Sequence, residues 1–322
     1  MRFVMSRKTK LILKGIATFI PGIRKIPRKG SMGGSISSRY CYSVWLRHLI
    51  MVWEKYRKNV PTTVAEIGPG ESLGTGLAAL LSGVNQYYGF DAVRFVNSDV
   101  DLVIFEELIR LFKNRVDIPG PNEFPLIKPF IESYEFPSHI LTDSHLENSL
   151  CNDRLDSIRK ALTDLRNNYN PDSPVNYFAP DYDLGKLPAE MFDMIFSQTA
   201  LEYIPDLRSF YKHTYELLRP DGIMSHQIDL TSMGLSDTWD GHWMYTDLEW
   251  KLIRGKKQCI INRATHSAHI NFLHDAGFII IDDIKKTSRP TVKREHLANH
   301  FRDLPEDDLH TTGTYILASK KP

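Results

Sequence analysis

The residues best suited to chemistry lie in one short stretch, VAEIGPGESLGTG, over residues 64–76. Its apolar residues predict a short buried strand that ends at Gly68. Gly68 and Gly70 let the chain turn tightly and approach a ligand, because neither residue has a Cβ. Glu66 places a carboxylate at the end of the strand, where it would repel a pyrophosphate and attract a cation. The stretch therefore predicts a site for a ligand that carries positive charge, although a tight turn without a ligand is the alternative.

A second acid follows one helix and one strand later. Residues 77–81 predict a buried helix and residues 86–90 a strand that ends at Asp91. A strand, glycine turn, helix, strand and acid in this order are typical of nucleotide-binding α/β sheets, which bind ligands beyond the carboxyl ends of their strands. A dinucleotide fingerprint needs a third glycine where this chain has Leu73. A dehydrogenase is therefore disfavoured.

The sequence EIGPG at residues 66–70 resembles the first motif of class I S-adenosylmethionine-dependent methyltransferases, and Asp91 matches the acid of their second strand. The resemblance implies that Glu66, Gly68, Gly70 and Asp91 bind S-adenosylmethionine, with Asp91 holding the ribose hydroxyls. A binding module that keeps the cofactor site without catalysis remains the alternative to an enzyme.

Two later strands extend this resemblance. The sequence FDMIFS at residues 192–197 resembles the fourth-strand motif, which implies that Ser197 and Gln198 lie beside the sulfonium. The sequence FAPDYD at residues 178–183 ends the expected third strand, where the family places residues against the adenine. Asp181 is therefore expected at the adenine amino group, with Tyr182 stacking on or capping the ring. A loop acid that is merely solvated is the alternative for Asp181.

Transfer to a hydroxyl needs a base to take its proton. In TALEYI, residues 199–204, Tyr203 replaces the histidine often found in the family, so other candidates are needed. His226 is the first because an imidazole titrates near neutral pH, Asp229 is the second or the orienter of His226, and His242 is the third. A structural hydrogen-bonding role is the alternative for each. No spacing of ligands supports a metal site.

The elements that position these residues predict an α/β fold. The order of segments matches a doubly wound, mostly parallel seven-stranded sheet of the Rossmann-like methyltransferase type, over roughly residues 60–320. Residues 278–284 and 314–318 are expected to form the final antiparallel pair. The methyltransferase domain would span residues 37–322, and its long proline-rich insertion, about residues 117–170, is interpreted as a lid over the substrate.

The acceptor is predicted to be a small-molecule or glycan hydroxyl, with N-methylation of a small molecule as the alternative. Three of the five tryptophans fall within residues 237–250, where they could stack on a sugar or form a satellite core. The stretches SRYCYSVWLRHL and IGPGESLG also resemble methyltransferases encoded with bacterial surface-polysaccharide enzymes. In the helix that begins near residue 38, Tyr40 or Arg47 could reach the methionine carboxylate.

The charge of the chain is unevenly distributed. Residues 1–53 contain eleven Lys or Arg and no Asp or Glu, whereas the remainder has 29 basic and 39 acidic residues. Residues 1–36 are therefore expected to form a basic arm that meets an anionic membrane, or a solubilising extension, and no specific nucleic acid is expected as a partner. Three dispersed cysteines and apolar runs too short to cross a bilayer predict a cytoplasmic protein, with peripheral membrane contact through the arm.

Overall fold

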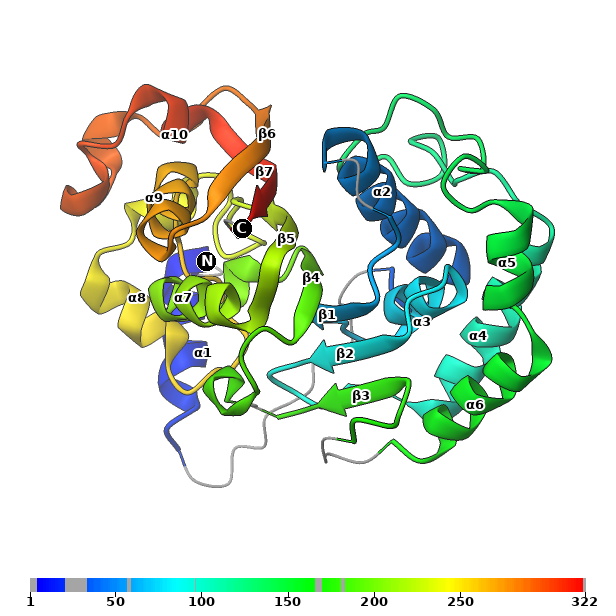
Figure 1. The fold of residues 1–322 in the computed structure, drawn as a ribbon. Helices are drawn as coiled ribbons and strands as arrows, with labels where there is room; N and C mark the ends of the chain where they lie inside the picture. Colours follow the sequence, from blue (N-terminus) through cyan, green and yellow to red (C-terminus); the bar gives the residue numbers. More distant parts are fainter. Residues whose placement is uncertain are drawn as a thin grey trace.

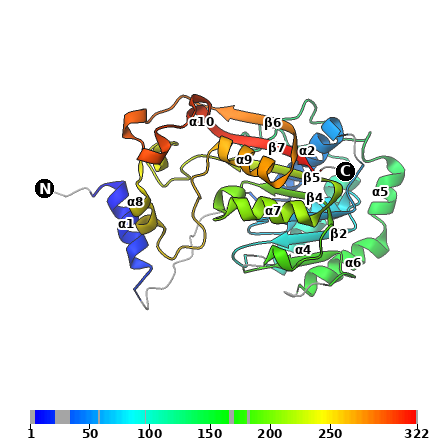
Figure 2. The same ribbon diagram turned by 60° about the vertical axis from the view of Figure 1, so that its left-hand side comes forward.

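The computed structural model describes residues 5–20, 34–56, 59–95, 97–165, 170–180 and 183–320. These residues form a sheet with helices on both faces (Figures 1 and 2). The strands are β1 (Thr63–Ile67), β2 (Gln86–Phe90), β3 (Val175–Phe178), β4 (Phe192–Gln198), β5 (Leu218–Asp229), β6 (Ile279–Thr287) and β7 (Thr311–Ser319). The helices are α1 (Arg7–Ala17), α2 (Ser38–Tyr56), α3 (Gly74–Leu81), α4 (Ser98–Lys113), α5 (Asp143–Ser149), α6 (Asn152–Thr163), α7 (Leu207–Leu217), α8 (Asp247–Arg254), α9 (His266–Ala276) and α10 (Glu306–His310). Short 3-10 helices are η1 (Leu184–Lys186), η2 (Leu201–Tyr203), η3 (Gly241–Met244), η4 (Arg294–His296) and η5 (Asn299–Phe301).

The strand order is β3-β2-β1-β4-β5-β7-β6. The first five strands in this order are parallel, and β7 runs antiparallel to both β5 and β6. This confirms the predicted doubly wound, mostly parallel seven-stranded sheet. The chain builds outward from β1 to β2 and β3, and then returns to place β4 on the other side of β1. The resulting switch point between β1 and β4 opens a crevice at their carboxyl ends.

The two faces of the sheet are covered by different helices (Figure 1). On one face α2, α3 and α4 pack over the sheet, and on the other face α7 and α9 do so. Both layers cover the sheet, so the central strands β1, β4 and β5 are buried along most of their length, as is usual for parallel strands. Trp45 shows how tightly α2 is held, because its ring is fully buried and its Nε1 donates to Ser82 Oγ at 2.8 Å.

The insertion at residues 117–170 does not occupy the position of a lid. Its first half passes along the outer side of α2, where the buried Arg47 donates from Nη1 to the carbonyl of Ile127 at 2.8 Å and from Nη2 to that of Pro119 at 3.0 Å. Its second half forms α5 and α6, which pack outside α3 and α4. Arg47 therefore anchors the insertion and does not reach toward a cofactor, which corrects both predictions.

The described part of the basic arm is not a free extension. Figure 2 shows α1 lying alongside α8, which follows the fifth strand. Arg7 Nε lies 2.6 Å from Asp237 Oδ1, and Lys8 forms an ion pair with Glu249. Residues 1–4 and 21–33 lie outside the described residues. Across the described residues, no helix combines the length and the apolar character needed to cross a membrane.

Candidate functional site

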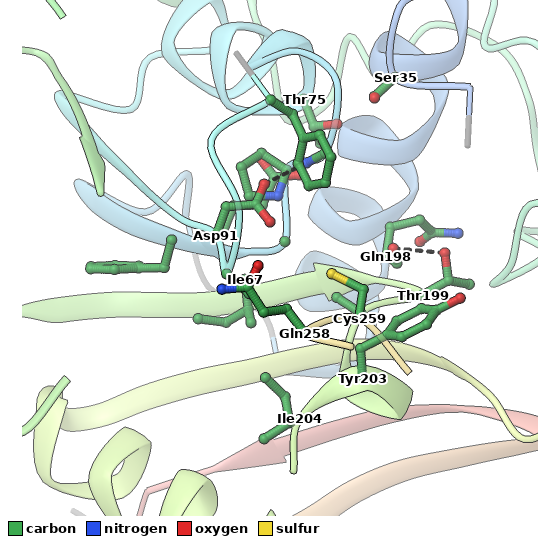
Figure 3. A pocket seen from close by; sticks show the side chains of 18 of the residues that line it. Ser35, Ile67, Thr75, Asp91, Gln198, Thr199, Tyr203, Ile204, Gln258 and Cys259 are labelled. Carbon is green, nitrogen blue, oxygen red and sulfur yellow. Dashed lines mark hydrogen bonds between the residues drawn. The ribbon is translucent and has the colours of Figure 1, made fainter. Parts of the chain in front are cut away.

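A cavity of about 810 Å³ opens where β1, β2 and β4 end (Figure 3). This volume lies within the range of small-molecule sites. Its walls come from the glycine turn after β1, the segments that follow β2 and β4, the start of α2, and the end of α8 with the loop behind it. The lining residues are Gly34, Ser35, Tyr40, Glu66, Ile67, Gly68, Pro69, Gly70, Thr75, Phe90, Asp91, Ala92, Phe95, Leu184, Gln198, Thr199, Ala200, Tyr203, Ile204, Pro205, Phe210, Met233, Arg254, Lys257, Gln258 and Cys259.

The glycine turn forms the floor of the cavity. After β1 the chain passes through Gly68 and Gly70, whose φ angles are 73° and 80°. This conformation strains any residue that has a Cβ. A Cβ on Gly68 would also lie 2.7 Å from the Cβ of Ala200, which follows β4. The backbone therefore requires glycine at both positions. Both glycines line the cavity, which is where the sequence predicts a ligand.

Two acids flank this turn, and they are the only acids in the described lining of the cavity. Glu66 is 2% exposed, and its Oε2 accepts a hydrogen bond from Tyr87 Oη at 2.7 Å. Asp91 Oδ2 accepts from the amide of Gly70 at 3.1 Å. Burial raises the pKa of Glu66 to about 8 and that of Asp91 to about 7, because each carboxylate loses hydration. A ligand that offers a cation and hydroxyl donors would favour the ionised forms.

Gln198 lies at the end of β4 with its side chain in the cavity wall (Figure 3). Its Oε1 is 3.3 Å from Nε2 of His48, whose Nδ1 is 2.7 Å from Ser225 Oγ. The Ser225 hydroxyl in turn lies 2.7 Å from Tyr315 Oη. Burial lowers the pKa of His48 to about 4, so the ring is neutral at pH 7. The sequence identified Gln198 but missed the network that orients it, because these partners come from α2, β5 and β7.

Ser197 and His226 do not reach the cavity. Their side chains point to the opposite face of the sheet, where Ser197 Oγ lies 2.7 Å from His226 Nδ1 and the imidazole packs against Phe210 of α7. His226 is 1% exposed, and burial lowers its pKa to about 3. The predictions of Ser197 beside the sulfonium and of His226 as the base are corrected accordingly. Alternation along β4 and β5 sends neighbouring side chains to opposite faces.

Asp229 and His242, the other two candidate bases, also lie outside the lining. Asp229 Oδ1 accepts from the amide of Thr231 at 2.7 Å, which stabilises the turn after β5. His242 is buried against Trp243, with 4.8 Å between ring centroids, and burial lowers its pKa to about 3. The burial of His242 in this cluster corrects its prediction as a base, whereas the role of Asp229 stays a prediction. Within the described chain, no three His, Cys, Asp or Glu side chains gather as metal ligands.

The segment 237–250 forms the satellite core that was the alternative to a sugar platform. Trp243 is fully buried and packs with Leu297 and Phe301 from the segment before β7. Trp250 packs in a second cluster with Ile253, and Leu11 of α1 covers that cluster. None of the tryptophans in this segment lines the cavity.

The adenine side is described only in part, because Asp181 and Tyr182 lie outside the described residues. Phe90, Ala92 and Phe95 line the cavity on either side of Asp91. The ring of Phe90 stacks on that of Phe178 with 5.2 Å between centroids, so β3 supports this wall from behind. The predicted roles of Asp181 and Tyr182 stay predictions.

Most residues at the end of the cavity opposite the adenine side were not predicted from the sequence. Tyr40 from α2 was foreseen, but the segment 254–259 that closes this end was not. In Figure 3, Cys259 lies beside Thr199 and Tyr203, and Gln258 extends toward Ile67. Arg254 and Lys257 make the same end cationic. The sequence RGKKQC has the composition of a surface loop, and only the packing of α8 places it in the cavity wall.

Comparison with known proteins gives one family match. Residues 153–225 match the family described as a methyltransferase domain. No curated protein matches the sequence. Similar solved structures include an S-adenosylmethionine-dependent methyltransferase from Mesorhizobium loti, with 14% identity, a TM-score of 0.41 and coverage of 86% of this chain and 97% of that chain. A second, from Methanosarcina mazei, has 13% identity, a TM-score of 0.39 and coverage of 84% and 97%. The [4+2]-cyclase SpnF has 14% identity, a TM-score of 0.39 and coverage of 98% and 93%.

The matched segment runs from α6 through most of β5 and includes β4, whose motif carried part of the sequence resemblance. The family match, the order of strands and the acid-flanked glycine turn together support the predicted class I methyltransferase with S-adenosylmethionine as its cofactor.

Proposed function

We propose that this chain transfers a methyl group from S-adenosylmethionine to a small-molecule acceptor. The observation that carries the proposal is the pair of buried acids, Glu66 and Asp91, that flank the glycine turn at the switch point of the sheet. S-adenosylmethionine carries an ammonium group and two ribose hydroxyls. A nearby cation and hydrogen-bond donors both stabilise the ionised form of a buried carboxylic acid. The residues present therefore fit this cofactor.

Each acid has a separate task in this proposal. Asp91 accepts hydrogen bonds from the ribose hydroxyls in addition to the bond from the Gly70 amide, since its two oxygens offer about four acceptor sites. Glu66 faces the positive charge of the methionine moiety, and the bond from Tyr87 fixes its orientation. Gly68 and Gly70 let the backbone approach the ligand, and Gln198 is held at the sulfonium side by His48. When bound, S-adenosylmethionine supplies an electrophilic methyl group.

The cavity also limits the chemistry of the acceptor. Methyl transfer requires an acceptor atom in line with the methyl group at about 3 Å. The described lining contains no histidine and no acid beyond Glu66 and Asp91, which this proposal assigns to the cofactor. The described lining therefore provides no further carboxylate and no imidazole that could take the proton of a hydroxyl acceptor. A neutral amine is a stronger nucleophile than a neutral hydroxyl and can attack without first losing a proton, and its methylated product can release the proton to water afterwards. This observation favours N-methylation of a small molecule over the hydroxyl transfer expected from the sequence.

A glycan acceptor and a link to surface-polysaccharide synthesis remain proposals of lower rank, because the tryptophans of segment 237–250 lie in a satellite core. Contact of the basic arm with an anionic membrane is also a proposal, and α1 is the part of the arm that supports it.

Calorimetric titration with S-adenosylhomocysteine and with NAD⁺ tests the cofactor assignment. We expect S-adenosylhomocysteine alone to bind, and we expect Glu66→Gln, which keeps the size of the side chain, to weaken binding by about tenfold because a charged contact is lost. Binding of NAD⁺ in preference would refute the assignment.

Methyl transfer is then followed by mass spectrometry on acceptors supplied as matched amine and alcohol pairs. We expect transfer to the amine member of a pair. Transfer to the alcohol alone would reverse the order of the two candidate reactions. Cofactor binding without transfer to any member would point to a binding module.

A further inference from the structure

Helix α1 holds two segments of the cavity wall together. At its start, Arg7 Nη1 donates to the carbonyl of Gly234 at 2.9 Å, directly after Met233 of the lining. At its end, the Thr18 hydroxyl oxygen accepts from the amide of Lys256 at 2.8 Å. Lys256 lies within the segment 254–259, which lines the same end of the cavity. One face of α1 is therefore packed against the walls of the end of the cavity that lies opposite the adenine side, which we call the acceptor end.

The contact between α1 and α8 is unusually close. A Cβ on Gly15 would lie 1.8 Å from the carbonyl oxygen of Leu252, and a Cβ on Gly255 would lie 2.3 Å from that of Gly15. The two helices can approach this closely only because both positions are glycine. The contact fixes the rotation of α1 about its own axis. The residues on the remaining faces of the helix are therefore presented in a defined direction.

A second face of α1 is apolar and exposed. Leu13 and Ile16 lie one turn apart, and Phe19 and Ile20 follow in the turn that ends the helix. Their exposures lie between 41% and 54%. Solvation of four large apolar side chains so close together is unfavourable, so this face indicates a partner.

The charges next to this face identify the partner. Lys10 and Lys14 are exposed on α1, and neither forms an ion pair with any residue in the described part of the chain. The helix contains no acid. Lys256 Nζ lies 5.3 Å from the ring centroid of Phe19, so a third cation borders the apolar residues. An apolar strip beside a row of lysines is the pattern of helices that lie in the surface of an anionic bilayer.

We propose that α1 docks on an anionic lipid bilayer, with Leu13, Ile16, Phe19 and Ile20 entering the headgroup region and Lys10 and Lys14 contacting lipid phosphates. The inner face of the same helix holds the segments 233–234 and 254–257, so docking brings the acceptor end of the cavity to within about one helix diameter, ~10–12 Å, of the membrane surface. The inference builds on the proposed function only in calling this the acceptor end.

Flotation of the full-length protein with vesicles tests the proposal. Vesicles that contain phosphatidylglycerol are compared with vesicles of phosphatidylcholine alone. We expect binding only to the first kind, and we expect it to fall as salt rises because lysine–phosphate attraction is screened. Leu13→Gln with Ile16→Gln should reduce binding by about tenfold or more through lost apolar insertion. Lys10→Gln with Lys14→Gln should reduce it to a similar extent.

A matched control is available elsewhere on the surface. Leu126 and Phe130 are 80% and 48% exposed, and Lys128 lies over the Phe130 ring. Leu126→Gln with Phe130→Gln should leave flotation unchanged. The proposal is overturned if the unmodified protein does not float with the anionic vesicles, if both α1 variants float as it does, or if the control pair loses binding equally.

Titration with S-adenosylhomocysteine in the absence of vesicles separates this proposal from the proposed function. The exposed α1 side chains do not line the cavity, so their variants should keep the cofactor affinity of the unmodified protein while losing flotation. A protein that floats but binds no S-adenosylhomocysteine would instead refute the cofactor assignment and leave the docking proposal standing.

Discussion

Replacement of Asp91 by Asn isolates the charge that the proposed cofactor site depends on. Asn has nearly the same shape, and its side-chain oxygen can still accept the hydrogen bond from the Gly70 amide, which is 3.1 Å long in the native protein. What is lost is the negative charge offered to the ribose hydroxyls. Hydrogen bonds to a charged group contribute about 1.5–3 kcal/mol, so we expect the Kd for S-adenosylhomocysteine to rise roughly 10- to 150-fold. Titration calorimetry at pH 8 measures this change directly.

A second aspartate provides the control for that experiment. Asp193 Oδ2 accepts from the amide of Thr63 at 2.8 Å, and its Oδ1 lies 2.8 Å from Arg219 Nη1, at the start of β4 and far from the cavity. Asp193→Asn should lower the free energy of unfolding and leave the Kd unchanged. If folded Asp91→Asn binds S-adenosylhomocysteine as tightly as the unmodified protein, Asp91 does not hold the ribose and the reasoning fails.

The structure supports three further predictions. Burial raises the pKa of Asp91 to about 7 and that of Glu66 to about 8, so both acids are mostly protonated at pH 6. Cofactor affinity should therefore rise by about tenfold or more between pH 6 and pH 8, which titrations across this range would detect. The Asp91→Asn variant should show a smaller rise. His226→Ala should leave methyl transfer intact and lower the free energy of unfolding by about 1–3 kcal/mol, measured by urea denaturation, since its ring is buried and does not line the cavity. A large loss of activity at unchanged stability would contradict this. Gly15→Val should detach α1 by steric conflict with the Leu252 carbonyl, which hydrogen exchange would detect as lost protection in that helix and which unchanged protection would disprove.

Much of the cofactor side was predictable because its residues are close in sequence. Glu66, Gly68 and Gly70 belong to one turn, and Asp91 ends the next strand, so a single strand–helix–strand unit brings all four together. The sheet was predictable for a similar reason. Apolar runs of strand length alternate with helices, and this pattern admits few arrangements other than a doubly wound sheet.

Prediction of the side chains that line the rest of the cavity required two kinds of information that local sequence patterns do not contain. The first is the direction of each side chain. Ser197 and Gln198 are adjacent, yet Gln198 lies in the cavity wall and Ser197 is buried against His226 on the other face. Which face of a strand adjoins the cavity is set by the helices that cover the sheet and not by the strand itself.

The second is contact between segments far apart in the chain. His48 orients Gln198 across 150 residues, and α1 supports the cavity wall at Gly234 across more than 200. The same packing buried the tryptophans of segment 237–250 and placed the insertion behind α2. From the sequence alone we could identify groups able to bind or react, because residue type and local spacing decide that. Only the tertiary structure decided which of them share a cavity, because burial and register arise from the packing of the whole chain.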